Sequence, residues 1–94
     1  MQNAEIIEIF ERYLTEDKKA SANTLSSYMR DIRKYSEYLD THTDATIVTA
    51  NDEDVGEYID YLRASGKSVA TVSRNIASLK CLYTHLCIKQ IIPV

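Results

Sequence analysis

Basic and hydroxyl-bearing side chains recur at helical spacing in two segments of this chain. With about 100° of rotation per helical residue, the polar face of the first segment carries Ser27, Arg30 and Lys34, with Ser26 and Arg33 at its edge. The polar face of the second carries Thr71, Arg74 and Ser78, with Lys67 just ahead of it. Guanidinium and ammonium groups neutralise phosphates, and hydroxyls donate hydrogen bonds to phosphate oxygens. The pattern indicates either a two-part surface for nucleic acid or two helix faces that are merely solvated.

The distribution of charge along the chain strengthens the first interpretation, although composition alone leaves both open. The net charge is only −3, but it is divided into blocks. Residues 1–17 carry −4, residues 18–35 carry +4, residues 36–62 carry −8, and residues 63–94 carry +5. Both basic blocks contain one of the two polar faces. The acidic blocks are expected to face water or another protein, because they would repel phosphates.

Other kinds of chemistry lack the residues that they need. His42 and His85 have no set of further ligands at metal-binding spacing, and the pair Cys81 and His85 supplies only two ligands. No glycine-rich phosphate loop or nucleophile motif is present. We therefore expect no metal, no cofactor and no catalytic residue in this sequence.

The two cysteines and the apolar runs indicate where the chain functions. Cys81 and Cys87 lie six residues apart on one expected helix, about 9 Å along its axis, which is too far for a disulfide. No apolar run reaches the length of a membrane span, and the N-terminal segment has no signal-peptide pattern. We expect a reduced, cytoplasmic protein that does not contact a membrane.

The elements that would position these residues are all helical. The 94 residues suit one domain, and the 45% hydrophobic content with two Gly and one Pro favours a compact all-α fold. Apolar periodicity predicts a first helix around Ile6–Leu14 and a second over Ala22–Leu39, capped by Ser21 or Asn23. A loop is expected over 40–50. Two further helices are predicted, one from Asn51 to near Ser65 and one from Ser68 to about Cys87.

The seven tyrosines divide into two groups by their place on these helices. Five lie on or beside apolar stripes and are expected in the core: Tyr13, Tyr28, Tyr35, Tyr58 and Tyr83. Tyr38 and Tyr61 are expected at the surface. None is expected to act as a nucleophile.

Two stretches resemble a known family of proteins. The run Ser21-Ala-Asn-Thr-Leu-Ser-Ser-Tyr-Met-Arg-Asp-Ile32, followed by Tyr35, Tyr38 and Leu39, resembles the opening helix signature of the N-terminal core-binding domain of tyrosine recombinases, the phage integrase and Xer family. The run Gly66-Lys-Ser-Val-Ala-Thr-Val-Ser-Arg-Asn-Ile-Ala-Ser-Leu-Lys-Cys-Leu-Tyr83 is similar to the last helix of that domain. With the acid-capped third helix between them, the resemblance covers nearly the whole chain.

The resemblance implies a four-helix, SAM-like bundle over residues 1–94 that grips one face of duplex DNA. A separate catalytic domain, which this sequence does not contain, would cut the opposite face and close a C-shaped clamp in DNA recombination or integration. The implied partners are double-stranded DNA and other protomers in a tetrameric synaptic complex, with the isolated domain monomeric. The residues that match DNA-contacting positions are Ser26, Ser27, Arg30, Lys34, Thr71, Arg74 and Ser78, with Lys67 and Arg33 beside them.

Within this set, Arg30 and Arg74 are the best candidates for base-edge or bidentate phosphate contacts, because a guanidinium offers a planar fork of donors. The first helix, or the acidic flank of the third, is expected to contact another protomer. An alternative function, from a different class, is a helical protein-interaction module whose basic faces bind an acidic partner.

Overall fold

The computed structural model describes residues 1–93, and these fold into helices joined by short connections. The helices are α1 (Asn3–Arg12), which continues into a π-helical turn η1 (Tyr13–Asp17), α2 (Ala22–His42), α3 (Asp52–Ala64) and α4 (Val69–Ile88). No strand occurs among the described residues. The predicted all-α fold with four principal helices is confirmed. None of the described helices combines the length and apolarity needed to cross a membrane.

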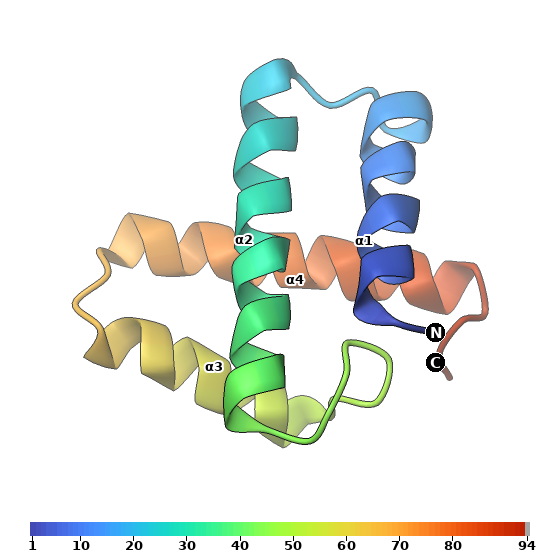
Figure 1. The fold of residues 1–94 in the computed structure, drawn as a ribbon. Helices are drawn as coiled ribbons and strands as arrows, with labels where there is room; N and C mark the ends of the chain where they lie inside the picture. Colours follow the sequence, from blue (N-terminus) through green and yellow to red (C-terminus); the bar gives the residue numbers. More distant parts are fainter. Residues whose placement is uncertain (94) are drawn as a thin grey trace.

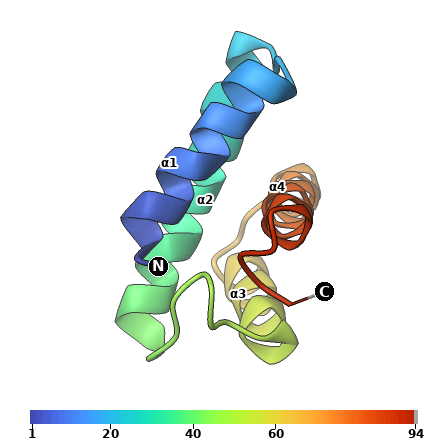
Figure 2. The ribbon, with the colours of Figure 1, turned by 90° about the vertical axis from the view of Figure 1, so that its right-hand side faces the viewer.

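The helices form two pairs that lie across each other. α1 and α2 run side by side in opposite directions, and α4 passes behind both of them, with α3 returning beneath it (Figure 1). Turned by 90°, the molecule shows α1 and α2 on one side and α3 and α4 on the other (Figure 2). α4 therefore packs against α2 on one side and against α3 on another, so that it joins the two pairs.

Side-chain caps fix where three of the helices begin. The Ser21 hydroxyl accepts a hydrogen bond from the Thr24 N–H at 3.2 Å, and the Ser68 hydroxyl accepts one from the Thr71 N–H at 3.1 Å. Asn51 and Asp54 form a reciprocal capping box, with hydrogen bonds of 2.9 and 3.1 Å. Of the two predicted caps for α2, Ser21 is the one used. α2 continues to His42, three residues beyond the predicted end.

The end of the first helix differs from the prediction. From Tyr13 the helix widens into a π turn that the apolar pattern did not indicate, so that the N–H of Lys18 donates to the carbonyl of Tyr13 at 2.9 Å. Lys19 then adopts a left-handed backbone with φ of 51° and turns the chain toward α2. Leu14 is completely buried in this turn. Local apolar spacing does not distinguish a π turn from an α-helical one, which is why the sequence did not predict it.

Aromatic rings form a large part of the core between α2 and α3. Tyr35 and Tyr58 are buried as predicted, with ring centroids 5.1 Å apart. The prediction that Tyr38 lies at the surface is wrong. Its side chain is only 8% exposed, because it packs against Tyr58 at 5.0 Å and Tyr61 at 5.1 Å. Tyr61 itself is 44% exposed, as expected. Half-buried Tyr13, Tyr28 and Tyr83 pack against the same core.

Candidate nucleic-acid interface

A buried carboxylate fixes the crossing of α2 and α4. Both oxygens of Asp31, on α2, accept hydrogen bonds from the Arg74 guanidinium on α4, at 2.8 and 3.0 Å. The Ser78 hydroxyl, one turn further along α4, donates to the same carboxylate at 2.8 Å. The Asp31 side chain is 3% exposed, whereas that of Arg74 is 36% exposed. Three donor groups thus satisfy an acid that would otherwise be costly to bury, and the bidentate geometry sets how the helices cross.

Two of the residues predicted to contact DNA, Arg74 and Ser78, instead bind Asp31 in this arrangement. The prediction that Ser78 lies on an exposed face is wrong. Its side chain is completely buried, because α2 covers it and its hydroxyl is used by Asp31. Arg74 remains partly exposed, but its Nε and one terminal nitrogen already bind Asp31, so only its other terminal N–H groups remain for a base edge or a phosphate. Both residues primarily hold the two helices together.

The remaining predicted residues surround this crossing. On α2, Ser27 and Lys34 lie on the same stripe as Asp31, one turn before it and one turn after it, and Arg30 is adjacent. On α4, Thr71 lies one turn before Arg74. Ser26, Arg30, Lys34 and Lys67 are exposed, and Ser27 and Thr71 are half-buried. The contact between Asp31 and Arg74 therefore brings together two polar segments that lie about 40 residues apart in the sequence.

Two of the lysines also share a hollow between the helix pairs. Lys34 from α2 and Lys67 from the turn between α3 and α4 line a cavity of about 390 Å³, together with Tyr61 and His42. Two lysines from different elements therefore line the same hollow. Glu37 lines the same hollow and partly offsets their charge.

Arg33 and Thr71 each interact with a neighbouring side chain, which reduces the charge or hydrogen-bonding capacity that they have left for a nucleic acid. Arg33 points toward α1, where its guanidinium lies 3.9 Å from the Glu11 carboxylate, with both side chains about half exposed. The Thr71 hydroxyl accepts a hydrogen bond from Ser68 at 3.0 Å and keeps its own proton for another acceptor. Arg30, Lys34 and Lys67 therefore carry most of the free positive charge at this surface.

A sequence signal for the Asp31 junction lies within the basic block 18–35. Asp31 is the only acid in the basic block 18–35, and it belongs to the recombinase-like motif. Arg74 and Ser78 are four residues apart, which places both on one side of a helix. A lone acid in a basic helix, opposite an Arg and a Ser at this spacing, is the pattern of a buried ion pair between helices.

The hydroxyls of Tyr35 and Tyr83 and the Cys81 thiol lie in surroundings that do not activate a nucleophile. The Tyr35 hydroxyl hydrogen-bonds that of Tyr83 at 2.7 Å, and Tyr83 donates to the carbonyl of Ile47 at 2.8 Å. Burial raises the pKa of Tyr83 to about 12 and the pKa of Tyr35 well above its ordinary value. Burial also raises the pKa of the Cys81 thiol. A nucleophile needs a lowered pKa or an adjacent base, so these groups serve packing.

Metal ligands are not gathered either. No group of three or more His, Cys, Asp or Glu side chains placed to hold a metal ion occurs within residues 1–93. Cys81 and Cys87 are free thiols, and both are partly buried.

Fold and surface together define an all-α domain whose basic face surrounds the crossing of its second and fourth helices. Residues 7–90 match the family model described as phage integrase, N-terminal SAM-like domain. The chain belongs to this family.

Curated relatives agree with this assignment. The chain is 37% identical over 86 residues to tyrosine recombinase XerD of Oceanobacillus iheyensis, which covers 90% of the chain and 29% of that protein. It is 34% identical over 83 residues to XerD of Listeria monocytogenes, covering 87% of the chain and 28% of the relative. With XerC of Pediococcus pentosaceus it shares 29% over 83 residues, again 87% and 28%. The chain thus spans less than a third of the length of these relatives. No solved structure matches it significantly.

Proposed function

We propose that this domain binds duplex DNA through the surface around the α2–α4 crossing and contributes site recognition to a site-specific tyrosine recombinase. The proposal rests on one observation above all. The Asp31–Arg74 pair, with bonds of 2.8 and 3.0 Å, holds α2 across α4 and so brings the two polar segments together at the crossing.

The roles of individual residues follow from their exposure. Arg30 is exposed and forms no ion pair among residues 1–93, so it is the residue proposed to read a base edge or grip a phosphate with its whole fork. Lys34 and Lys67, from different elements, are proposed to contact phosphates. Ser26, Ser27 and Thr71 are proposed to donate hydroxyl protons to the backbone. Arg74 positions α4 and adds charge at the edge of the surface.

The domain itself performs no catalysis in this proposal. Breaking and rejoining DNA would belong to a catalytic domain in the part of the recombinase that this chain does not match, and other protomers would be partners in the assembled complex. Because one domain forms only half of such a clamp and its net charge is −3, we expect the affinity of the isolated domain to be weak and strongly dependent on salt.

The proposal is tested by titrating the domain with a short duplex, following amide NMR shifts and affinity at several salt concentrations. Lys34→Ala should weaken binding to any sequence and lower the salt slope by about 1, because one phosphate contact is lost. Lys89→Ala is the matched control. It removes the same charge at the far end of α4, where Lys89 is exposed, and should leave the slope unchanged.

The positions of the amides whose NMR signals shift distinguish DNA binding at the proposed surface from the alternatives. Shifts that gather at residues 26–34 and 67–74 and fade with added salt would support the proposed surface. Equal salt slopes for the Lys34 and Lys89 variants would remove Lys34 from the phosphate contacts. Shifts confined to the acidic α3, or no response to DNA, would overturn the proposal and favour a domain that binds a protein.

A further inference from the structure

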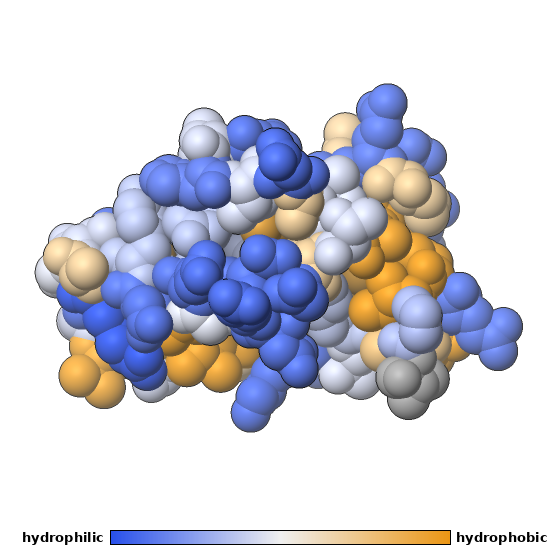
Figure 3. Space-filling model, turned by 90° about the horizontal axis from the view of Figure 1, so that it is seen from below, coloured by the Kyte–Doolittle hydropathy of each residue, from blue (hydrophilic) through white to orange (hydrophobic). Residues whose placement is uncertain are grey.

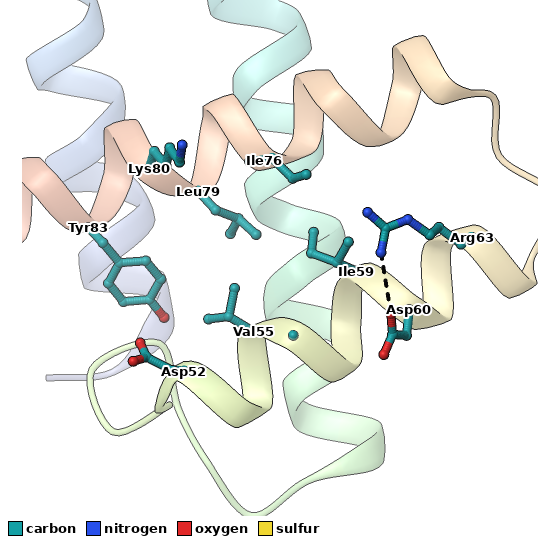
Figure 4. A pocket seen from close by; sticks show the side chains of 10 residues that line it. Asp52, Val55, Ile59, Asp60, Arg63, Ile76, Leu79, Lys80 and Tyr83 are labelled. Atoms are coloured by element: carbon teal, nitrogen blue, oxygen red, sulfur yellow. Dashed lines mark hydrogen bonds and ion pairs between the residues drawn. The ribbon is translucent and has the colours of Figure 1, made fainter.

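A groove between α3 and α4 leaves apolar side chains without a partner. It has a volume of about 520 Å³, and Val55, Ile59, Ile76, Leu79 and Tyr83 line it. Figure 4 shows these side chains converging from the two antiparallel helices, with charged residues at the ends and rim. Seen from below, hydrophobic groups reach the surface in patches between large hydrophilic ones (Figure 3).

The apolar surface continues beyond the groove. Tyr83 also borders two neighbouring hollows, one lined by Val48, Ile92 and Cys87 and the other by Lys80 and Ile88. Ile88, at the end of α4, is 72% exposed. The apolar surface around Tyr83 is therefore larger than the groove alone.

Gly56 provides an independent reason to expect a partner. It lies in the middle of α3 and lines the groove, although glycine is among the poorest helix formers. A Cβ atom built at Gly56 would meet nothing within 4 Å, so nothing inside the described domain requires a glycine there. The only space that a side chain at this position would fill is the open groove. A glycine at such a position allows another chain to approach the backbone closely.

The charges around the groove indicate what that chain is. The α3 wall is acidic, with Asp52, Glu53, Asp54, Glu57 and Asp60 on the helix and a single base, Arg63, which is paired with Asp60 at 3.4 Å. The α4 wall has no acid at all and carries Lys80 at the rim. In Figure 4, Asp52 and Lys80 lie toward the same end of the groove on opposite walls. Such a surface complements itself when a second copy is rotated by 180° about an axis along the groove, because each α3 then faces the other copy's α4.

We propose that the groove between α3 and α4 is a surface on which two copies of this chain associate about a two-fold axis. The apolar side chains of one groove cover those of the other, the α4 of each copy passes over Gly56 of its neighbour, and Asp52 of each copy faces Lys80 of the other. The proposal does not depend on DNA binding, since it uses a different face of α4 and is tested without DNA.

The contact is small for a stable dimer. Specific interfaces that persist in dilute solution bury about 1,200–2,000 Å², and a single groove of this size provides less. Association is therefore expected only at high protein concentration. The dissociation constant of the dimer is expected to be on the order of 1 mM or somewhat below. Dilute protein is expected to be monomeric, in line with the monomer that the family resemblance implies.

The first test is sedimentation velocity and concentration-dependent amide NMR on the 94-residue chain, at concentrations up to about 1 mM. The mass should rise toward that of a dimer, with shifts confined to the groove segments 52–63 and 76–88. Gly56→Gln, which favours the helix but fills the groove with a polar side chain, should remove the association. Gly56→Ala should weaken the association by a smaller factor than Gly56→Gln, because a single methyl group obstructs the approach of the second copy less.

A charge exchange identifies the pairing. Lys80→Glu and Asp52→Lys should each weaken association at least about fivefold, since every charge pair occurs twice in a two-fold interface. The double variant should restore it. A monomer at every concentration, shifts at another surface, or a dimer that Gly56→Gln leaves intact would overturn the proposal. Circular dichroism of each variant separates lost association from lost folding.

Discussion

The two sides of α4 contact their neighbours in opposite ways. Toward α2, α4 buries a charged group and satisfies it with three donors from Arg74 and Ser78. Toward α3, it leaves apolar side chains lining an open groove whose charged residues stay at the exposed rim. A buried ion pair is specific about geometry, whereas apolar contact tolerates many arrangements. We infer that the α2–α4 side fixes the fold and that the α3–α4 side retains surface for association.

The largest expected effect comes from breaking the buried pair. Arg74→Ala leaves the 3% exposed carboxylate of Asp31 with Ser78 as its remaining donor, and should lower the free energy of unfolding by about 2–4 kcal/mol. Arg63→Ala is the matched control, because Arg63 also pairs with an aspartate, at 3.4 Å, but both side chains are more than 60% exposed. It should cost no more than about 0.5 kcal/mol. The measurement is urea unfolding followed by circular dichroism.

Similar costs for the two arginine variants would contradict the contrast between the two sides of α4. They would mean that water reaches Asp31 once Arg74 is removed, so that the acid is solvated and the junction contributes little more than a surface pair.

A smaller effect on stability is expected from a substitution at Tyr83, whose side chain contacts both the α2 side and the α3 side of α4. Its ring lines the groove, and its hydroxyl joins the buried Tyr35 hydroxyl to the carbonyl of Ile47, at 2.7 and 2.8 Å. Tyr83→Phe keeps the ring but leaves the Tyr35 hydroxyl without its partner, and should destabilise the domain by about 1–2 kcal/mol. Tyr61→Phe, at a side chain that is 44% exposed, should stay within about 0.5 kcal/mol of the wild type.

The Tyr83→Phe variant also tests whether two copies of the chain associate through apolar contact at the groove. If the groove associates through apolar contact, Tyr83→Phe should dimerise at least as well as the wild type although it unfolds more easily. Loss of association in this variant would show that the hydroxyl network, rather than apolar contact, supports the interface.

The helices and their caps could be predicted from the sequence because both depend on neighbours along the chain. Apolar residues at helical spacing and the caps Ser21, Asn51 and Ser68 are local signals, and the structure confirms them. The family resemblance rested on the same local runs. The π turn after α1 was missed because it changes the hydrogen-bond register and not the apolar pattern.

The errors in the site arose where distant elements meet. Asp31 and Arg74 are 43 residues apart, so the sequence showed two polar faces but not that an acid and an arginine within them would pair and bury Ser78. Tyr38 was assigned to the surface for the same reason, since two rings from α3 cover it. A polar residue on a helix face can point to solvent or to a crossing helix, and only the crossing decides between these outcomes.

The smallest expected effect tests whether a buried polar group on α4 always carries a cost that depends on pH. His85 is 4% exposed and stacks on Tyr13 of η1, with ring centroids 4.0 Å apart. Burial, and secondarily Lys89, lower the pKa of His85, while Asp17 opposes this. The folded state therefore binds a proton less readily than the unfolded chain. The associated stability is present above the unfolded value of about 6.5 and is lost as the pH falls below it.

The matched variants isolate this contribution from the carboxylates that titrate in the same range. His85→Phe keeps a stacked ring without a titrating group, so its loss of stability between about pH 7 and pH 5 should be smaller than that of the wild type. His42→Phe, at an exposed histidine on α2, should follow the wild type. Urea midpoints at the two pH values provide the measurement. Identical pH dependence in all three proteins would mean that the imidazolium is accommodated beside Asp17 in the folded state. In that case the cost of burying His85 would not depend on pH.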